Sequence, residues 1–250
     1  MPASSSPESV AGGGPSLPGG DAGRAVPVRV WDRPLRLFHW LLVLCLLGSF
    51  VSVKAGGYWM DWHFRFGYAA LGLLIFRILW GVVGPRYARF ASFVHAPSRL
   101  VAYLRGGPEA PQVLGHSPLG ALSVFAMLLA IAVQATTGLF TSDQIATEGP
   151  LARMVSGATI DNASRVHHFN QNVILVLVGL HLLALLFYRL VRRRSLVKPM
   201  LVGDKLVAPH AAVPDPAALA ARDDAGVLLR AVIAAAIAAA AVTTIVRWPA

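Results

Sequence analysis

The chain has 250 residues, of which 56% are hydrophobic and only 14% are charged. An ordinary soluble domain has about 25% charged residues, so this composition excludes one and is typical of a membrane protein. The formal net charge is +10, but the Arg and Lys residues lie between apolar segments, and we therefore expect no nucleic-acid partner. The one cysteine, Cys45, lies inside an apolar segment, and a disulfide within the chain is excluded.

Residues 1–28 are rich in Ala, Gly, Ser and Pro and contain no apolar core, a composition that predicts a disordered leader. Five apolar segments follow, and each is long enough to cross a membrane as a helix. The predicted spans are Leu37–Val53, Phe64–Val83, Leu119–Phe140, Val166–Leu190 and Val227–Val246. Between the second and third spans, Pro97–Arg105 begins with Pro and ends before two glycines, which predicts a short helix on the membrane surface.

Basic residues are unevenly distributed among the connections. They cluster before the first span, between the second and third, and after the fourth, whereas the first-to-second and third-to-fourth connections carry few of them. Cytoplasmic connections of membrane proteins are enriched in Lys and Arg, so the three basic segments belong on the cytoplasmic side. The sequence therefore predicts a cytoplasmic N-terminus, five crossings and a C-terminus on the outer side.

The fourth span contains three histidines, His167, His168 and His181. Histidine inside a bilayer is costly and by default marks function. At about 100° per residue, the step from His167 to His181 is within roughly 40° of four full turns, so the two imidazoles share a face and lie about 21 Å apart along the axis. His168 points roughly 140° away from His181. This spacing predicts that the helix gives one ligand, His167 or His181, to each of two haems.

The predicted orientation places the histidines at two depths. His39, near the start of the first span, matches His181 on the cytoplasmic side; we call these two the inner pair. His63, at the start of the second span, matches His167, and these two are the outer pair. Two imidazoles on one iron leave no open position, which suits electron transfer, and the lack of a C-x-x-C-H motif indicates non-covalent, b-type haem. Each histidine taken alone also fits an interfacial position; the matching depths favour ligation.

For the other polar residues of the spans, the sequence allows two alternative roles each. Arg36 and Arg77 are candidates to neutralise haem propionates, since buried cations need anionic partners, although Arg77 also fits a side chain that reaches toward the membrane surface. Gln134 favours a hydrogen bond between helices over a quinone contact. Asn170 and Asn172 favour capping of the wet helix end over hydrogen bonding to a ligand histidine. Three further histidines lie in connections and are expected to be solvated or interfacial: His95, His116 and His210.

Several segments resemble the bacterial cytochrome b561 family, which includes the cytochrome b subunits of nickel-iron hydrogenases. The first is V-W-D-R-P-L-R-L-F-H-W at Val30–Trp40. Trp62–Phe90 is similar to the second span of that family with the basic loop after it, and G-H-S-P-L-G at Gly115–Gly120 to the segment before its third span. His167 and His181 fall where its fourth span carries two ligands.

The resemblance covers about residues 28–205 and implies an all-α membrane protein. Residues 29–205 would form a four-helix bundle that binds two b haems through His39, His63, His167 and His181. The resemblance says nothing about the fifth span, for which the apolar sequence itself predicts a linker at 206–226 and a transmembrane helix at 227–246. It implies an electron carrier, or a membrane subunit of an oxidoreductase, in the bacterial inner membrane. Its partners would be quinone and a hydrogenase, a dehydrogenase or a c-type cytochrome. Two other classes remain open, a transporter or proton relay that uses the intramembrane His and Arg, and a haem-free docking anchor.

Overall fold

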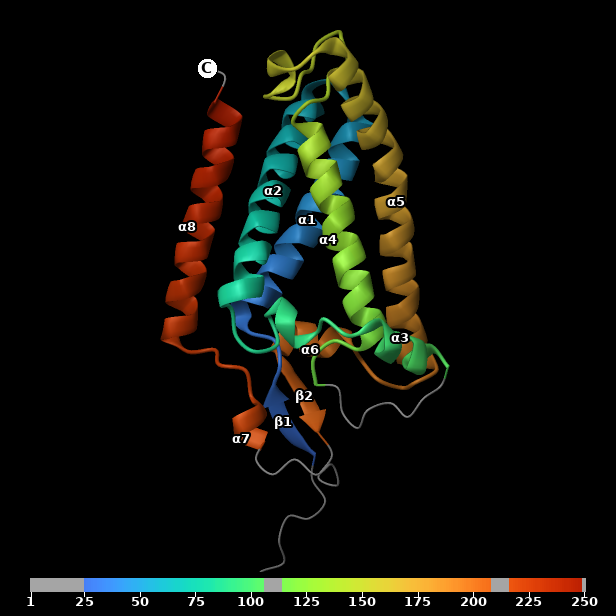
Figure 1. The fold of residues 1–250 in the computed structure, drawn as a ribbon, viewed down its shortest axis with the longest axis vertical. Helices are drawn as coiled ribbons and strands as arrows, with labels where there is room; N and C mark the ends of the chain where they lie inside the picture. The colour runs from blue at the N-terminus through green and yellow to red at the C-terminus, as the bar shows by residue number, and fades with distance from the viewer. Residues whose placement is uncertain (1–24, 106–113, 208–215, 249–250) are drawn as a thin grey trace, which may run out of the picture.

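Five helices long and apolar enough to cross a membrane run side by side within residues 25–105, 114–207 and 216–248, the part of the chain that the computed structural model describes (Figure 1). They are α1 (Arg33–Ala55), α2 (Met60–Val83), α4 (Pro118–Gly138), α5 (Gly157–Leu190) and α8 (Ala225–Arg247). The five predicted spans are thereby confirmed as helices. The largest difference is that α5 begins nine positions before the predicted span.

Four of these helices begin with a side-chain cap, which satisfies a backbone N–H that the first turn leaves free. Asp32 caps α1 by accepting from Leu35 N at 2.9 Å, and Asp224 caps α8 by accepting from Val227 N at 3.0 Å. Ser117 and Ser156 cap α4 and α5 in the same way. α5 begins early because Ser156 caps it. The polar residues between Ser156 and the apolar segment are helical as well.

The helices pack in an order that places α5 and α8 on opposite sides. α1 lies against α2, and at Gly48 the two come so close that a Cβ there would lie 2.5 Å from the Phe66 ring. α4 packs on both α2 and α5, and α8 packs on α2 outside the four-helix group (Figure 1). Asn170 is the one buried residue of α5. The face that α5 turns toward α1 and α2 is therefore not filled by tightly packed side chains.

A short antiparallel sheet joins two segments far apart in the sequence, which the all-α expectation did not include. β1 (Val26–Arg29) pairs with β2 (Asp204–Val207), with Val26 opposite Val207 and Arg29 opposite Asp204. The sheet lies below the bundle together with α6 (Val197–Val202) (Figure 1). β1 takes up the last residues of the predicted leader, and β2 begins before the predicted linker; residues 1–24 and 208–215 lie outside the described part of the chain.

Five smaller helical elements complete the fold, two short α-helices and three 3-10 turns. α3 (Pro97–Leu104) confirms the predicted short helix, and it lies across the lower end of the bundle in Figure 1. α7 (Pro216–Leu219) stands beside the sheet, and the 3-10 turns η1, η2 and η3 are at Gly57–Trp59, Phe90–Ser92 and Ala152–Met154.

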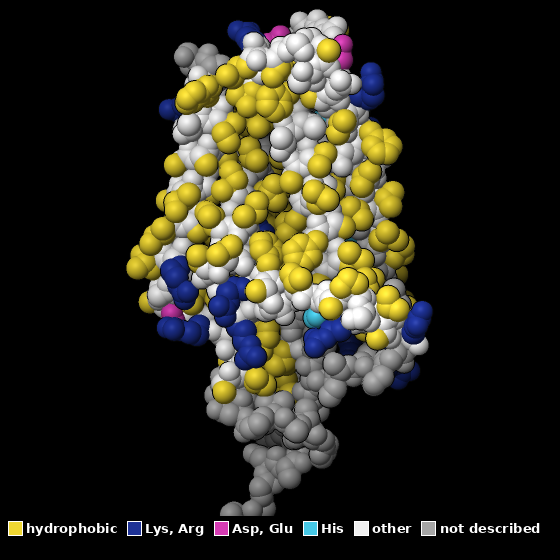
Figure 2. Space-filling model, viewed as in Figure 1, with side chains coloured by type: hydrophobic (Ala, Val, Ile, Leu, Met, Phe, Trp, Pro, Cys, Tyr) yellow, Lys and Arg dark blue, Asp and Glu magenta, His cyan; other side chains and the backbone are white. Residues whose placement is uncertain are grey.

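The surface has a broad apolar band between two polar ends (Figure 2). Lys and Arg gather at the end that carries the sheet, and Asp and Glu are seen mainly at the opposite end, with few in the band between. We call these the sheet end and the outer end. The three basic connections thus lie together at one end, as the sequence predicted.

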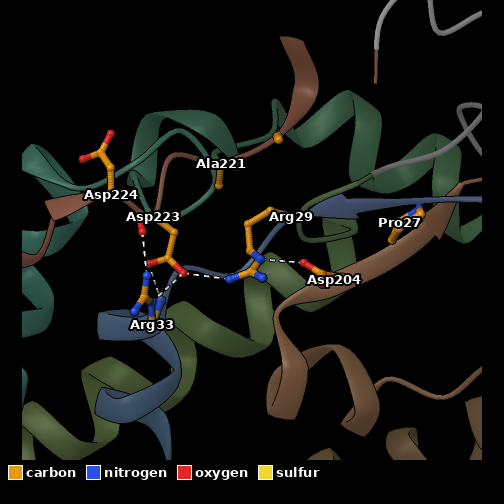
Figure 3. A pocket seen from close by; sticks show the side chains of 8 residues that line it. Pro27, Arg29, Arg33, Asp204, Ala221, Asp223 and Asp224 are labelled. Atoms are coloured by element: carbon orange, nitrogen blue, oxygen red, sulfur yellow. Dashed lines mark hydrogen bonds and ion pairs between the residues drawn. The ribbon is translucent and has the colours of Figure 1, made fainter. Parts of the chain in front are cut away.

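Ion pairs hold the segment before α8 to the sheet (Figure 3). The Asp223 carboxylate, whose side chain is only 8% exposed, accepts from Arg29 at 2.7 Å and from Arg33 at 3.1 Å. Arg29 also donates to Asp204 of β2 at 2.5 Å. These charges line a shallow pocket, but they are paired with one another and so act as a structural clamp. α8 is fixed to the start of α1 and to β2.

Candidate functional site

α5 places His167 and His181 on its inward face, as the helical spacing predicted. The helix is continuous from Gly157 to Leu190, so the spacing of about 21 Å along the axis applies without a break. Both imidazoles are half-buried, whereas His168 is exposed. His167 therefore faces the bundle and His168 the surface, which is the difference in direction that the helical spacing predicts.

The outer pair comes together at the outer end of the bundle. The ring centroids of His63 and His167 lie 6.3 Å apart, and the ring planes are 80° to each other. An imidazole nitrogen lies about 2.0 Å from a metal ion that it binds. Two imidazoles on opposite sides of one ion then have centroids about 6 Å apart, counting about 1 Å from each nitrogen to its ring centre. The observed separation matches that arrangement.

Backbone carbonyls of neighbouring helices fix both rings of the outer pair. His63 Nδ1 donates to Ser49 O of α1 at 2.9 Å, and His167 Nδ1 donates to Gln134 O of α4 at 3.0 Å. A carbonyl oxygen only accepts hydrogen bonds, so in both rings the proton is on Nδ1. The lone pair of each Nε2 is then free to bind a metal, in the usual arrangement of a ligand histidine whose other nitrogen is held.

The α4–α5 interface supports the ring of His167 from two further directions. A Cβ at Gly138 would lie 3.0 Å from His167 Cε1, so a small residue is needed at that position. Asn170, 7% exposed, donates to Ala130 O and to Gln134 Oε1, both at 2.8 Å. The expectation for Gln134 is confirmed. That for Asn170 is wrong, because the helix begins 13 positions earlier and this amide holds two helices together.

The inner pair is less tightly arranged. His39 of α1 and His181 of α5 are both half-buried and close enough to interact electrostatically. His39 packs edge-on against Trp40 at 5.0 Å, but no ring contact of the kind found in the outer pair joins it to His181. His39 Nδ1 is buried and has no hydrogen-bond partner among the described residues. A buried polar nitrogen without a hydrogen-bond partner lowers stability by about 1–3 kcal/mol. The described residues therefore leave the His39 ring incompletely stabilised.

The two candidate arginines lie at the same depth as the inner pair or below it. Arg36 donates to the carbonyl of Leu201 in α6, and its buried Nε has no hydrogen-bond partner among the residues that the structure describes. Arg77 is 2% exposed; its guanidinium carbon lies 4.5 Å from the centre of the Phe90 ring, and Nη1 has no hydrogen-bond partner in the described part of the chain. Arg77 is thus enclosed by protein at the sheet-end side of α2, and its role toward a propionate stays a prediction.

His116, which was expected to be solvated or interfacial, is half-buried at the sheet end and packs between aromatic rings. Its ring centre lies 4.4 Å from that of Phe93 and 4.7 Å from that of Trp31. Burial, with the charges of Arg77, Lys205 and His95, lowers the pKa of His116 to about 3, so the ring is neutral near pH 7. His95 is half-buried, with Nε2 3.4 Å from His116 O; His210 lies outside the described residues.

Several contacts at these sites could not be predicted from the sequence. The carbonyls of Ser49 and Gln134 belong to the backbone, which every residue provides. Lys205, whose pKa burial lowers to about 8, meets His116 only because β2 pairs with β1. The spacing and depth of the histidines predicted which residues approach one another, and packing decided how each ring is held.

The fold and these side chains define a class: a multi-pass helical membrane protein with histidines placed in pairs along the interior of its bundle. Residues 30–203 match the prokaryotic cytochrome b561 family over most of the chain, and the chain belongs to that family. It is therefore a b-type cytochrome, a haem-binding membrane protein of electron transport. α8 lies beyond the matched residues.

The chain is also similar to individual bacterial proteins. It is 28% identical over 212 residues to the probable Ni/Fe-hydrogenase B-type cytochrome subunit of Azotobacter chroococcum mcd 1, covering 70% of this chain and 87% of that protein. It is 25% identical over 215 residues to the subunit of the same name from Rhizobium leguminosarum bv. viciae, covering 72% and 89%. No solved structure matches the chain.

Proposed function

We propose that the chain binds two b haems in the bacterial inner membrane and passes electrons between the quinone pool and a redox partner. The inner pair, His39 and His181, holds one haem, and the outer pair, His63 and His167, holds the other. The outer pair carries the proposal. Its rings are 6.3 Å apart, and each has its proton committed to a carbonyl and its Nε2 free.

The donor set suits haem. Within the described residues no group of three or more His, Cys, Asp or Glu is placed to hold a metal ion. Bound haem supplies a one-electron carrier whose porphyrin provides four of the six iron ligands, so two imidazoles complete the coordination.

The residues around the imidazoles orient them and adjust their basicity. The carbonyls of Ser49 and Gln134 accept hydrogen bonds from Nδ1 of the outer pair. These bonds fix the ring planes and make the lone pair of each Nε2 a stronger electron-pair donor to a metal. Arg36 and Arg77 supply positive charge on the side of the inner pair, and each has a buried nitrogen without a hydrogen-bond partner in the described part of the chain. These two cations suit the propionates of the inner haem.

Two haems about 21 Å apart along α5 connect the two membrane surfaces. The Lys and Arg at the sheet end support a cytoplasmic position for that end and for the N-terminus. The relatives named as hydrogenase cytochrome subunits support a nickel-iron hydrogenase as the partner. In this proposal the quinone is the second redox partner.

A reduced-minus-oxidised absorption spectrum of the purified protein tests the proposal. We expect b-type bands and about two haems per chain, since a helical bundle has room for a site at each end. A transporter or proton relay that uses the same His and Arg would give no such bands, and a docking anchor would bind its partner without any of the four histidines.

The partner is tested in membranes that contain the chain together with a nickel-iron hydrogenase. We expect hydrogen gas to reduce the haems there, and a quinone analogue to reoxidise them. Membranes without the hydrogenase are the control. Reduction that is equally fast in the control would exclude the hydrogenase as the partner.

A further inference from the structure

A second polar cluster lies at the sheet end, outside the four candidate ligands. Its centre is His116, whose ring lies between Trp31 and Phe93. Lys205 of β2 reaches the same place, with Nζ 5.5 Å from the centre of the Trp31 ring. Chain segments far apart in the sequence thus enclose one small region.

Arg77 belongs to this cluster. Its guanidinium stacks on Phe90, whose ring contacts that of Phe93, and its charge acts on His116. Among the described residues, the carboxylate whose charge acts on Arg77 is that of Asp32, which is 0% exposed and whose Oδ2 has no hydrogen-bond partner there. Asp32 Oδ1 already accepts from Leu35 N and from Trp80 Nε1.

The cluster has more positive than negative charge and has unused donors. Neither Arg77 nor Lys205 forms an ion pair within the described part of the chain. Lys205 Nζ donates to Leu114 O at 2.7 Å and to Gly115 O at 3.2 Å, which uses two of its three protons. Arg77 Nη1 and His116 Nδ1 are buried and have no partner among the described residues. Burying cations and donors without partners is unfavourable, and an anion bound between them would stabilise them.

We propose that Arg77, His116 and Lys205 together bind one carboxylate of the inner haem, an inference that rests on the proposed function. His116 and Lys205 lie outside the membrane-spanning helices, on the segment before α4 and on β2. Residues 114–117, directly before α4, and the sheet are then part of the inner haem site. An anionic lipid headgroup offers the same charge, and the experiment separates the two sources.

The test is a redox titration of the purified dihaem protein, in which the two haems are followed separately. The inner haem is identified by its loss in the His181→Leu variant. Lys205→Met removes the charge and keeps a side chain of similar length, and Lys205→Arg keeps the charge. Lys198→Met, at an exposed lysine of α6 at the same end, is the matched control.

Lys205→Met is expected to lower the reduction equilibrium constant of the inner haem about tenfold, which is about 59 mV for one electron. The reason is that ferrous haem carries one positive charge less than ferric haem, so a nearby cation favours the reduced form. Lys205→Arg and Lys198→Met should leave that potential unchanged, and the outer haem should not respond to any of the three variants.

Equal shifts of both haems, or no shift of the inner haem in a protein that still holds two, would overturn the inference and leave the proposed function intact. A protein without haem bands contradicts the proposed function itself. His116→Phe, which keeps the ring packing and removes Nδ1, provides a second variant if Lys205→Met does not fold. A shift that occurs in vesicles of phosphatidylglycerol but not in phosphatidylcholine would assign the site to a lipid anion and overturn the haem carboxylate.

Discussion

The outer and inner histidine pairs differ in how completely the protein alone arranges them. In the outer pair both Nδ1 atoms donate to carbonyls, and the rings are 6.3 Å apart. In the inner pair His39 Nδ1 has no partner within the described residues, and no ring contact joins His39 to His181. One depth of the bundle is organised by helix packing, and the other depends on segments outside the helices.

The difference follows from which helices meet at each depth. The outer rings are held by the close α1–α2 and α4–α5 interfaces, where Ser49 and Gln134 are within reach. The inner rings lie on α1 and α5, and these two helices are not packed closely against each other. We therefore expect the outer site to be ordered before haem binds and the inner site to become ordered with it.

The largest expected effect is the loss of one haem. His167→Leu should reduce the haem content from two to one per chain, because the outer iron loses one of its two imidazoles. His168→Leu, at the exposed neighbour, is the control and should retain both. Haem content by absorbance measures the result. The pairing is wrong if both variants lose the same amount.

A smaller effect is expected from the amide that joins α4 to α5. Asn170→Ala removes two hydrogen bonds of 2.8 Å and leaves Gln134 Oε1 without that donor. We expect a loss of about 1–3 kcal/mol in the free energy of unfolding, since a buried acceptor is left unpaired. Denaturant unfolding followed at the haem band measures it. Asn172→Ala, on the exposed side of the same helix, should be nearly neutral. Equal losses in the two would argue against a special role for Asn170.

Gly138 allows a finer test of the outer pair alone. In Gly138→Ala the new Cβ would lie 3.0 Å from His167 Cε1, so the ring must move by a few tenths of an ångström. We expect an altered ligand geometry in the low-temperature electron paramagnetic resonance signal of the outer haem and none in that of the inner haem. Gly179→Ala on α5, where nothing lies within 4 Å of the new Cβ, is the control. A change in the inner signal would contradict the assignment of depths.

The smallest expected effect is a pH dependence confined to the sheet end. Burial raises the pKa of Asp32, and its hydrogen bonds from Leu35 and Trp80 only partly oppose this. The folded chain therefore binds the proton more tightly than the unfolded chain. The resulting stability is present below the unfolded pKa and is lost as pH rises through the folded pKa.

Thermal unfolding across the acidic range measures this dependence. Asp32→Asn should remove that component of the pH dependence and keep an amide oxygen that can accept from Leu35 N at the cap of α1. An unchanged pH profile in the variant would show that another group is responsible.

The sequence predicted the spans and the pairing of depths because both depend on periodicity and charge. Val166–Leu190 is apolar enough to be recognised, and the 14-position step between His167 and His181 fixes their shared face. It did not predict the ring contact of His116 with Trp31 or its approach to Lys205, since these residues are brought together only when β1 pairs with β2. It also missed the role of Asn170, because a polar residue near a span end has the same pattern whether it caps a helix or joins two.

The pairing of β1 with β2 has a consequence for the order in which the protein is made. β1 is synthesised before any membrane span, and β2 only after the fourth. Lys205 and the α6 carbonyl that accepts from Arg36 arrive with that late segment. The surroundings of the inner pair are thus complete only when four helices have entered the membrane, whereas Ser49 and His63 meet once the second has done so. Both pairs need α5 for His167 and His181, but only the inner pair also needs the segment that is synthesised after α5.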